Sequence, residues 1–425
     1  INPQWMWNLK LGNLWVSFGV DGISFLFIYL TALLVPLCII FGWKSYENVE
    51  LSICLLSIEC MLLLAFMVWD ILFFYIFFEL ILVPFFAFIG ILGYRRRRIH
   101  AAYLLFFYTV FGSLFLLLTL IGLWLSTGTT DLLLLRDIKW IGNEEHILWW
   151  CMFLSFAVKV PMFPFHLWLP EAHVEAPTEG SVLLAGVLLK LGTYGMLRFL
   201  FSLFPASTLY YSPVILGISC CGVIYSSLVT LRQIDMKKII AYSSVSHMNM
   251  CMLGLFSGDS VGLFGSFLVM VGHGIVSAAL FFCVGIYYVR THTKLLFYYS
   301  GLVYTMPLGT TFWFLFVLGN LSMPGTSNFI GEFLLVAGIS NIGMWFGVFA
   351  LVCGIFFGTI YNMWLFNKMS FGIPYYSMMN STKDINVTEL LILSILLFYM
   401  LWMGIYPRTW IDISYYALIN GSTIS

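Results

Sequence analysis

Apolar runs of helical length recur along almost the whole chain. Each spans about 20 residues, the length that an α-helix needs to cross the hydrocarbon core of a bilayer. Of the 425 residues, 61% are hydrophobic and 9% are charged, whereas an ordinary soluble globule has a charged share of about 25%. The sequence therefore predicts an all-α polytopic membrane protein. About twelve spans are expected, near residues 21–43, 51–69, 70–93, 101–125, 146–168, 177–203, 211–231, 237–256, 260–290, 307–340, 342–369 and 389–406.

Composition and charge argue against several function classes. The formal net charge is +0 and no basic patch is visible, so nucleic acid is not expected as a partner. The nine cysteines lie almost wholly within apolar runs and form no CxxC motif. The sequence therefore predicts neither a zinc site, an iron–sulfur cluster nor a disulfide framework. No metal and no cofactor is expected in this chain.

The basic residues counted with the loops, some of them at the ends of the expected spans, are biased toward one side of the membrane. Counting alternate loops from the first span gives roughly twelve to five, which assigns the richer side to the cytoplasm or matrix. The richer side holds Lys44, Arg95 to Arg98, Arg232, Lys237, Lys238, Arg290, Lys294, Lys368 and Lys383. The poorer side holds Lys10, Arg136, Lys139, Arg198 and Arg408. The run Arg95 to Arg98, on the richer side, is interpreted as a topology anchor that contacts anionic membrane lipids.

Two of the expected spans contain helix-breaking residues. Pro161 and Pro164 follow Lys159, and proline removes a backbone donor and clashes with the preceding turn, so this helix should break. The second break is expected within NLSMPGTSNFIGE, residues 320–332. Broken helices at matching places in two inverted halves indicate a transport site.

The two breaks also define an internal repeat. We predict two inverted five-helix repeats, at 51–203 and 204–370, each with its fourth helix broken. An N-terminal interfacial segment and the first membrane helix occupy 1–50. A C-terminal loop, the last helix and a tail occupy 371–425.

Ionisable residues lie deep inside the expected spans: Glu79, Lys159, Lys190, His247, His273 and Glu332. A lysine at the bilayer centre costs at least about 3 kcal/mol on insertion scales, so such residues usually mark ion pathways. Lys159 is the natural partner of Glu79. Lys190 is flanked by small residues, and a buried lysine can exchange its proton near neutral pH. The two histidines stand between Lys190 and Glu332 in sequence, which favours a relay.

Each of these residues also has a structural interpretation that the sequence leaves open. Glu79 can be neutral and hydrogen-bonded to the backbone, and Lys190 can extend its ammonium toward the membrane surface. Glu332 follows the second break closely enough to cap a helix. The histidines can be satisfied core residues.

One loop on the positive side is crowded with titratable residues, including His166 and His173. We interpret it as a solvated mouth that takes up protons. A metal site is the alternative, but the two histidines are separated by prolines and lack the i, i+4 spacing of helical metal ligands.

Several stretches of the chain match a known family: KVPMFPFHLWLPEAHVEAPTEGSVLLAGVLLKLGTYG, LRQIDMKKIIAYSSVSHMNM, HGIVSAALFFCVG followed by RTHTK, and NFIGEF. They resemble the antiporter-like membrane subunits of NADH:ubiquinone oxidoreductase, respiratory complex I. The resemblance runs from about Asp21 to the C-terminus. It implies two inverted five-helix repeats and a proton path along the central membrane axis. It also implies two family helices before the one that contains Asp21, which this chain is expected to lack.

By position, the resemblance implies a role for each buried ionisable residue. Glu79 and Lys159 would form an ion pair that faces a neighbouring subunit, and Lys190 would be the central proton carrier. His247 and His273 would bridge from Lys190. Glu332 would face the exit or the next subunit.

The expected function is translocation of protons across the inner mitochondrial membrane by a membrane-arm subunit, coupled to NADH oxidation and ubiquinone reduction elsewhere. NADH, FMN, iron–sulfur clusters and ubiquinone are expected in partner subunits, which include neighbouring antiporter-like subunits. The alternative is a stand-alone cation/proton antiporter of the same fold family, which would need no electron-transfer partners. A haem protein would need paired axial ligands on facing helices, and an assembly scaffold would not need buried charges.

Overall fold

The computed structural model describes residues 5–11, 14–43, 48–93, 95–138, 140, 143–374 and 383–421. Within them the chain is helical apart from its connections and an antiparallel hairpin of β1 (Trp5–Leu11) and β2 (Leu14–Val20). The first helices are α1 (Gly22–Gly42), α2 (Asn48–Met67), α3 (Ile71–Leu80), α4 (Leu82–Leu92), α5 (Arg98–Thr127), α6 (Leu132–Arg136), α7 (Asn143–Lys159) and α8 (Trp168–Glu175). A continuous helix follows as α9 (Thr178–Leu183), η1 (Leu184–Leu188), α10 (Leu189–Gly195), η2 (Met196–Leu200) and α11 (Phe201–Leu203).

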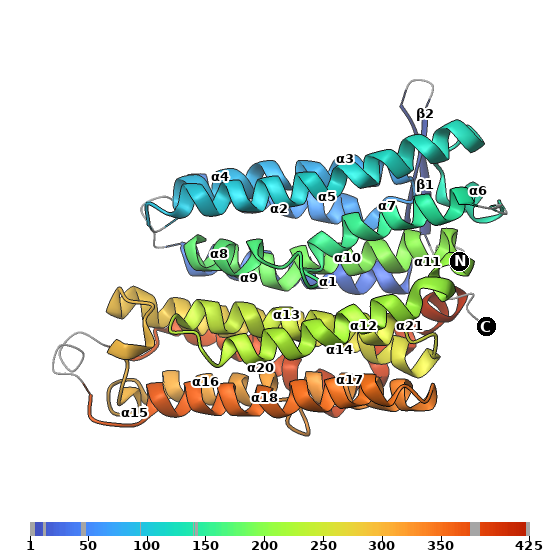
Figure 1. Cartoon of the computed structure of the whole chain (residues 1–425). Helices are drawn as coiled ribbons and strands as arrows, with labels where there is room; N and C mark the ends of the chain where they lie inside the picture. Colours follow the sequence, from blue (N-terminus) through green and yellow to red (C-terminus); the bar gives the residue numbers. More distant parts are fainter. Residues whose placement is uncertain are drawn as a thin grey trace.

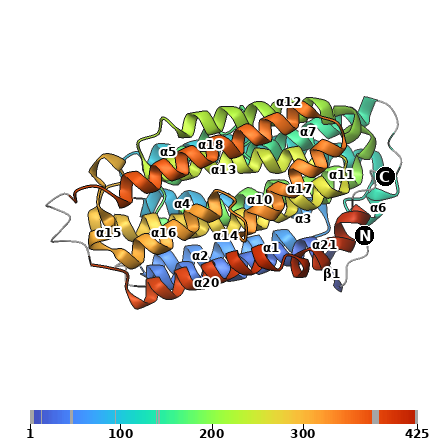
Figure 2. The same ribbon diagram turned by 90° about the horizontal axis from the view of Figure 1, so that it is seen from below.

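The second half of the chain continues the same pattern. Its elements are α12 (Pro205–Thr230), α13 (Met236–Leu255), α14 (Ser260–Thr291), η3 (Leu296–Tyr298), α15 (Leu302–Thr305), α16 (Pro307–Asn320), α17 (Ser327–Asn341), α18 (Trp345–Ser370), α20 (Val387–Ile405) and α21 (Arg408–Gly421). The long helices lie side by side along one direction (Figure 1). Seen from below, α14 lies in the interior of the bundle, between α13 on one side and α1 and α20 on the other (Figure 2).

Each of the expected spans coincides with a helix or with a broken pair of helices. In the described residues, nine helices are long and apolar enough to cross a membrane. The expected spans absent from these nine are the two broken ones, α7–α8 and α16–α17, and α13. The last carries Lys237, Lys238 and His247. The prediction of an all-α polytopic membrane protein is confirmed, while the inverted relation of the two repeats stays a prediction.

Both breaks lie where the prolines place them. α7 ends at Lys159 and α8 begins at Trp168, whose Nε1 donates to the Val158 carbonyl at 3.0 Å. The second break separates α16 from α17, and Gly325 within it has φ of +92°, a conformation that favours glycine. Because the helix is interrupted at each break, backbone groups without helical hydrogen bonds and polar side chains lie near the middle of the span.

The N-terminal segment, expected only to lie at the membrane interface, forms the β1–β2 hairpin. Trp5 and Trp7 on β1 are 66% and 61% exposed, as aromatic residues at an interface usually are. The hairpin is held by Trp69, whose backbone N–H donates to Ser17 O and whose Nε1 donates to Gly19 O, both at 3.0 Å. It stands across the same end of the bundle as α6 (Figure 1).

Arg198 was counted among the loop charges, and the structure shows that this assignment is wrong. Its side chain is 1% exposed in η2, inside the helix that spans Thr178–Leu203. It forms a bidentate ion pair with Asp21, at 2.6 Å and 2.7 Å. The Asp21 carboxylate supplies the counter-charge that a buried guanidinium requires, so Arg198 does not report on topology.

Candidate functional site

Lys190 lies at the centre of the bundle, one turn after an irregularity in its helix. Residues 184–188 form the π turn η1, and Lys190 follows in α10 with 0% exposure. Its Nζ donates to the Ala185 carbonyl at 2.5 Å. π turns are rare and recur at functional sites. Here the turn leaves a carbonyl within reach of the ammonium of the same helix.

A line of polar side chains leads away from Lys190 across three helices. Lys190 Nζ lies 2.9 Å from His273 Nδ1 on α14. The ring centroids of His273 and His247, on α13, are 5.5 Å apart. His247 Nδ1 is 3.3 Å from Glu332 Oε1 on α17, near enough for an ion pair when the imidazole is protonated, although the two atoms are not aligned as a hydrogen bond. The structure therefore brings together the four residues expected to form the second half of the relay.

Small residues allow these helices to approach one another at the site. A Cβ added to Gly274, next to His273, would lie 2.7 Å from a Leu30 methyl and 3.1 Å from the Gly186 carbonyl of the π turn. A Cβ added to Gly331, next to Glu332, would lie 2.5 Å from a Val269 methyl on α14. Glycine at these positions lets the backbones pack closely, as in many membrane helix pairs. The approach holds Lys190, His273 and Glu332 within reach of their neighbours.

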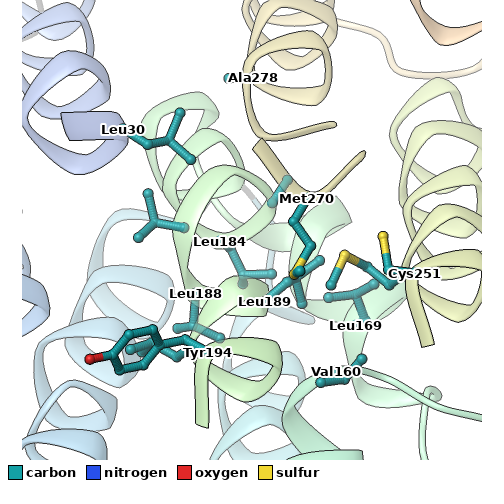
Figure 3. Packing of buried hydrophobic residues seen from close by; sticks show 14 of the residues in the cluster. Leu30, Val160, Leu169, Leu184, Leu188, Leu189, Tyr194, Cys251, Met270 and Ala278 are labelled. Carbon is teal, nitrogen blue, oxygen red and sulfur yellow. The ribbon is translucent and has the colours of Figure 1, made fainter. Parts of the chain in front are cut away.

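The surroundings of Lys190 are apolar. Leu184, Leu188 and Leu189 of its own helix pack with Met270 of α14 and Cys251 of α13 (Figure 3). At the other end of the line a cavity of about 10 Å³ is bordered by His247, Glu332 and Tyr361, among others, which is about the space of one water molecule. Charge on Lys190 is thus shielded from bulk water, whereas Glu332 has room for a water.

Lys159 and Glu79 are close enough to interact but do not form a direct ion pair. Lys159 is 0% exposed, its Nζ has no hydrogen-bond partner, and it lies 4.4 Å from the centroid of the Phe78 ring. Glu79 on α3 is half-buried, and its charge acts on Lys159. No described carboxylate lies within 4.0 Å of Lys159. A Cβ on Gly192 would lie 3.1 Å from Lys159 Cβ, so α7 packs directly against the helix of Lys190.

The two histidines expected at a solvated mouth are buried. His166 and His173 are 2% and 0% exposed, and neither ring has a hydrogen-bond partner. His173 is in α8 and stacks on Phe281, with centroids 4.7 Å apart. The expectation of a solvated loop is wrong for these rings, because α8 packs against α5 and α13. Proton uptake through them stays a prediction.

Sequence reasoning missed two lysines at the C-terminal end of α8. Lys237 Nζ donates to Ala176 O at 2.9 Å and to Ser181 Oγ at 3.0 Å. Lys294 Nζ donates to Val174 O at 2.5 Å. Both are buried and bind carbonyls at the end of a helix, where cations are favourable. Burial lowers the pKa of Lys294 to about 8, although Glu175 opposes the change. Lys237 and Lys294 were counted among the loop charges. Only their burial in the structure distinguishes them from exposed loop lysines.

In the residues that the structure describes, no group of three or more His, Cys, Asp or Glu side chains could hold a metal ion. The site is instead a set of single proton-exchanging groups, each within a few ångströms of the next on the Lys190 side. Ammonium, imidazole and carboxylate groups in such a line can pass protons.

Comparison with known proteins gives consistent likenesses. Residues 69–358 match the family described as NADH:quinone oxidoreductase/Mrp antiporter, transmembrane, and this range contains every buried ionisable residue of the candidate site. The chain is 47% identical over 410 residues to NADH-ubiquinone oxidoreductase chain 4 of Chondrus crispus, covering 96% of this chain and 83% of that protein. The Arabidopsis thaliana protein of the same name is also 47% identical, over 415 residues, covering 97% and 83%.

Solved structures show the same fold. The chain is similar to one in respiratory complex I from Thermus thermophilus with bound NADH, with a TM-score of 0.92 and 27% identity over 99% of this chain and 89% of that chain. It is also similar to a chain of the Mrp complex from Dietzia, with a TM-score of 0.89 over 98% and 87% of the two chains. At 18% identity the second likeness concerns the fold alone.

Proposed function

We propose a proton-translocating role along a defined line of residues for this chain, which belongs to the NADH:quinone oxidoreductase/Mrp antiporter family of membrane subunits. It is an antiporter-like membrane subunit of respiratory complex I, and its partners are other subunits of that assembly. We place it in the inner mitochondrial membrane, beside other antiporter-like subunits. We assign NADH, FMN, the iron–sulfur clusters and ubiquinone to partner subunits.

The observation that carries the proposal is the contact between Lys190 Nζ and His273 Nδ1 at 2.9 Å. A buried ammonium that already faces an imidazole nitrogen can hand over a proton without a large rearrangement. His247 and Glu332 continue the line at 5.5 Å between rings and 3.3 Å between atoms. A proton on Glu332 would then leave by the adjoining cavity.

The line begins at Lys159, whose protonation depends on the charge of Glu79. While Glu79 is ionised and near, its charge favours the protonated form of Lys159. When Glu79 moves away or is neutralised, Lys159 loses that support and releases its proton toward Lys190, on the helix packed against α7. Moving one charge across the membrane costs about 2.3 kcal/mol per 100 mV, so redox energy from other subunits must drive the change in pairing.

The experiment is a proton-pumping measurement on the assembled complex carrying Lys190→Ala. We expect the variant to assemble and to lose coupled pumping through this subunit, because the central carrier is absent. Lys368→Ala is the matched control, since Lys368 is an exposed lysine at the end of α18. Normal pumping by fully assembled Lys190→Ala complex would contradict the proposal.

The stand-alone antiporter differs in one readily measured property. A complex I subunit must co-migrate with electron-transfer subunits on a native gel, whereas an independent antiporter must not. The identities of 47% to proteins named as chain 4 of the oxidoreductase support the first outcome.

A further inference from the structure

A cavity of about 450 Å³ opens where four helix ends meet. It lies between the end of α1, the start of α9, the end of α14 and the start of α20. Ile40, Phe41, Val289 and Ile392 form much of its apolar wall, and Glu179 and Glu389 contribute carboxylates. Its volume falls within the range of about 300–1,000 Å³ that is usual for small-molecule sites. None of the residues in the proposed proton line borders this cavity.

The two carboxylates differ in their surroundings. Glu389 is bound by Arg290, with contacts of 2.7 Å and 3.1 Å, and is thereby neutralised. Glu179 is 5% exposed. Its Oε2 accepts a hydrogen bond from Thr178 at 2.9 Å. Its carboxylate has no described lysine or arginine within 4.0 Å, although Lys237 acts on it at longer range. A buried carboxyl group in this position is stabilised either by a nearby cation or by protonation.

Gly42 leaves the space beside Glu179 Oε1 open. A Cβ on Gly42 would lie 3.2 Å from Glu179 Oε1 and 3.0 Å from a Leu51 methyl, so any larger residue would crowd this oxygen. The helix ends that border the cavity are the ends of four helices long and apolar enough to cross a membrane, so we infer that they lie where apolar spans meet the membrane surface. This is the depth of lipid head groups.

We propose that this cavity binds the primary ammonium group of an amphiphile, with the ammonium on Glu179 Oε1 and the hydrocarbon chain along Ile40, Phe41 and Ile392. A primary ammonium can both neutralise the carboxylate and donate a hydrogen bond to Oε1. A trimethylammonium group has no proton to donate and fits this oxygen poorly. The ligand is therefore a phosphatidylethanolamine head group or a free long-chain amine.

The test is equilibrium binding of dodecylammonium to the purified complex, with dodecanol as the neutral analogue. We expect saturable binding of dodecylammonium, and we expect that dodecanol does not displace it. Glu179→Gln should weaken it about tenfold or more, the factor expected when a hydrogen bond to a charged group is lost. Ile40→Trp fills the cavity from a side chain that is 38% exposed and should weaken binding without removing the charge. Glu144→Gln, at an exposed carboxylate beside a different surface cavity, should change nothing.

The two sources of the ammonium are separated by competition. If phosphatidylethanolamine in nanodiscs displaces the probe and phosphatidylcholine does not, the site takes the lipid head group. If neither lipid displaces it, the site takes free amines. Equal binding by Glu179→Gln and the unaltered complex, or equal competition by dodecanol, would overturn the proposal.

Discussion

The buried ion pair between Asp21 and Arg198 makes a specific prediction about stability. Arg198 is held by two short contacts to Asp21, by Tyr194 Oη at 3.2 Å, and by the Trp69 ring at 4.2 Å from its guanidinium carbon. Asp21→Asn keeps the N-terminal cap of α1, because asparagine caps helices as well as aspartate does. It leaves a buried guanidinium without its counter-charge, which should cost about 3–5 kcal/mol.

The matched control is the exposed pair Arg408–Asp412, whose side chains are 78% and 63% exposed at 3.3 Å. Asp412→Asn should cost less than about 1 kcal/mol, since water screens the pair. The double variant Asp21→Asn with Arg198→Met should regain much of the loss, because no unpaired charge stays buried. The assay is thermal denaturation of the purified complex, and the readout is the fraction of this subunit that stays bound in the complex.

The stability that the Asp21–Arg198 ion pair contributes should fall at low pH. Burial raises the pKa of Asp21, but the charge of Arg198 and the hydrogen bonds outweigh this, so the pKa is lowered below its ordinary 3.8. The stability from this pair is therefore full above about pH 4 and is lost as the pH falls toward the lowered pKa. Equal destabilisation by Asp21→Asn and Asp412→Asn, or no recovery in the double variant, would refute the reasoning.

The remaining predictions concern other parts of the chain. Glu79→Gln should lower the proton-to-electron ratio while NADH oxidation continues, because Lys159 loses its counter-charge; an unchanged ratio would remove Glu79 from the path. The lowered pKa of Lys294, about 8 against an ordinary 10.5, means that the unfolded chain holds more protons between these values. Stability measured by thermal denaturation should therefore rise from pH 8 to pH 10.5, and Lys294→Met should abolish the rise. Gly338→Ala should destabilise the complex by about 1–3 kcal/mol, since its Cβ would lie 2.3 Å from Gly262 N; an unchanged denaturation midpoint would contradict that packing.

The sequence was sufficient for the fold class and for much of the site. Hydrophobic runs locate membrane helices because the bilayer imposes a length, and Pro161 and Pro324 locate the breaks because proline cannot continue a helix. Buried charge is costly, so Lys190 and Glu332 stand out within apolar runs. The structure then adds the contact between Lys190 and His273, on different helices, which periodicity cannot supply.

Other features depend on packing that the sequence does not encode locally. Arg198 and Lys237 were interpreted as loop charges, because their partners are separated from them by 177 and 61 residues. The π turn η1 has no proline or charge to mark it. His173 was expected in solvent, because a loop rich in titratable residues usually is; only the tertiary packing of α8 buries it.

The central claim is that protons pass along one line from Lys159 to Glu332, and a water-resolving structure of the native membrane complex tests it most directly. We predict ordered waters between Lys159 Nζ and Lys190, and a further water in the cavity beside Glu332, with His273 still in contact with Lys190. A dry gap between Lys159 and Lys190, or Lys190 turned away from His273 in every state of the working complex, would contradict the account.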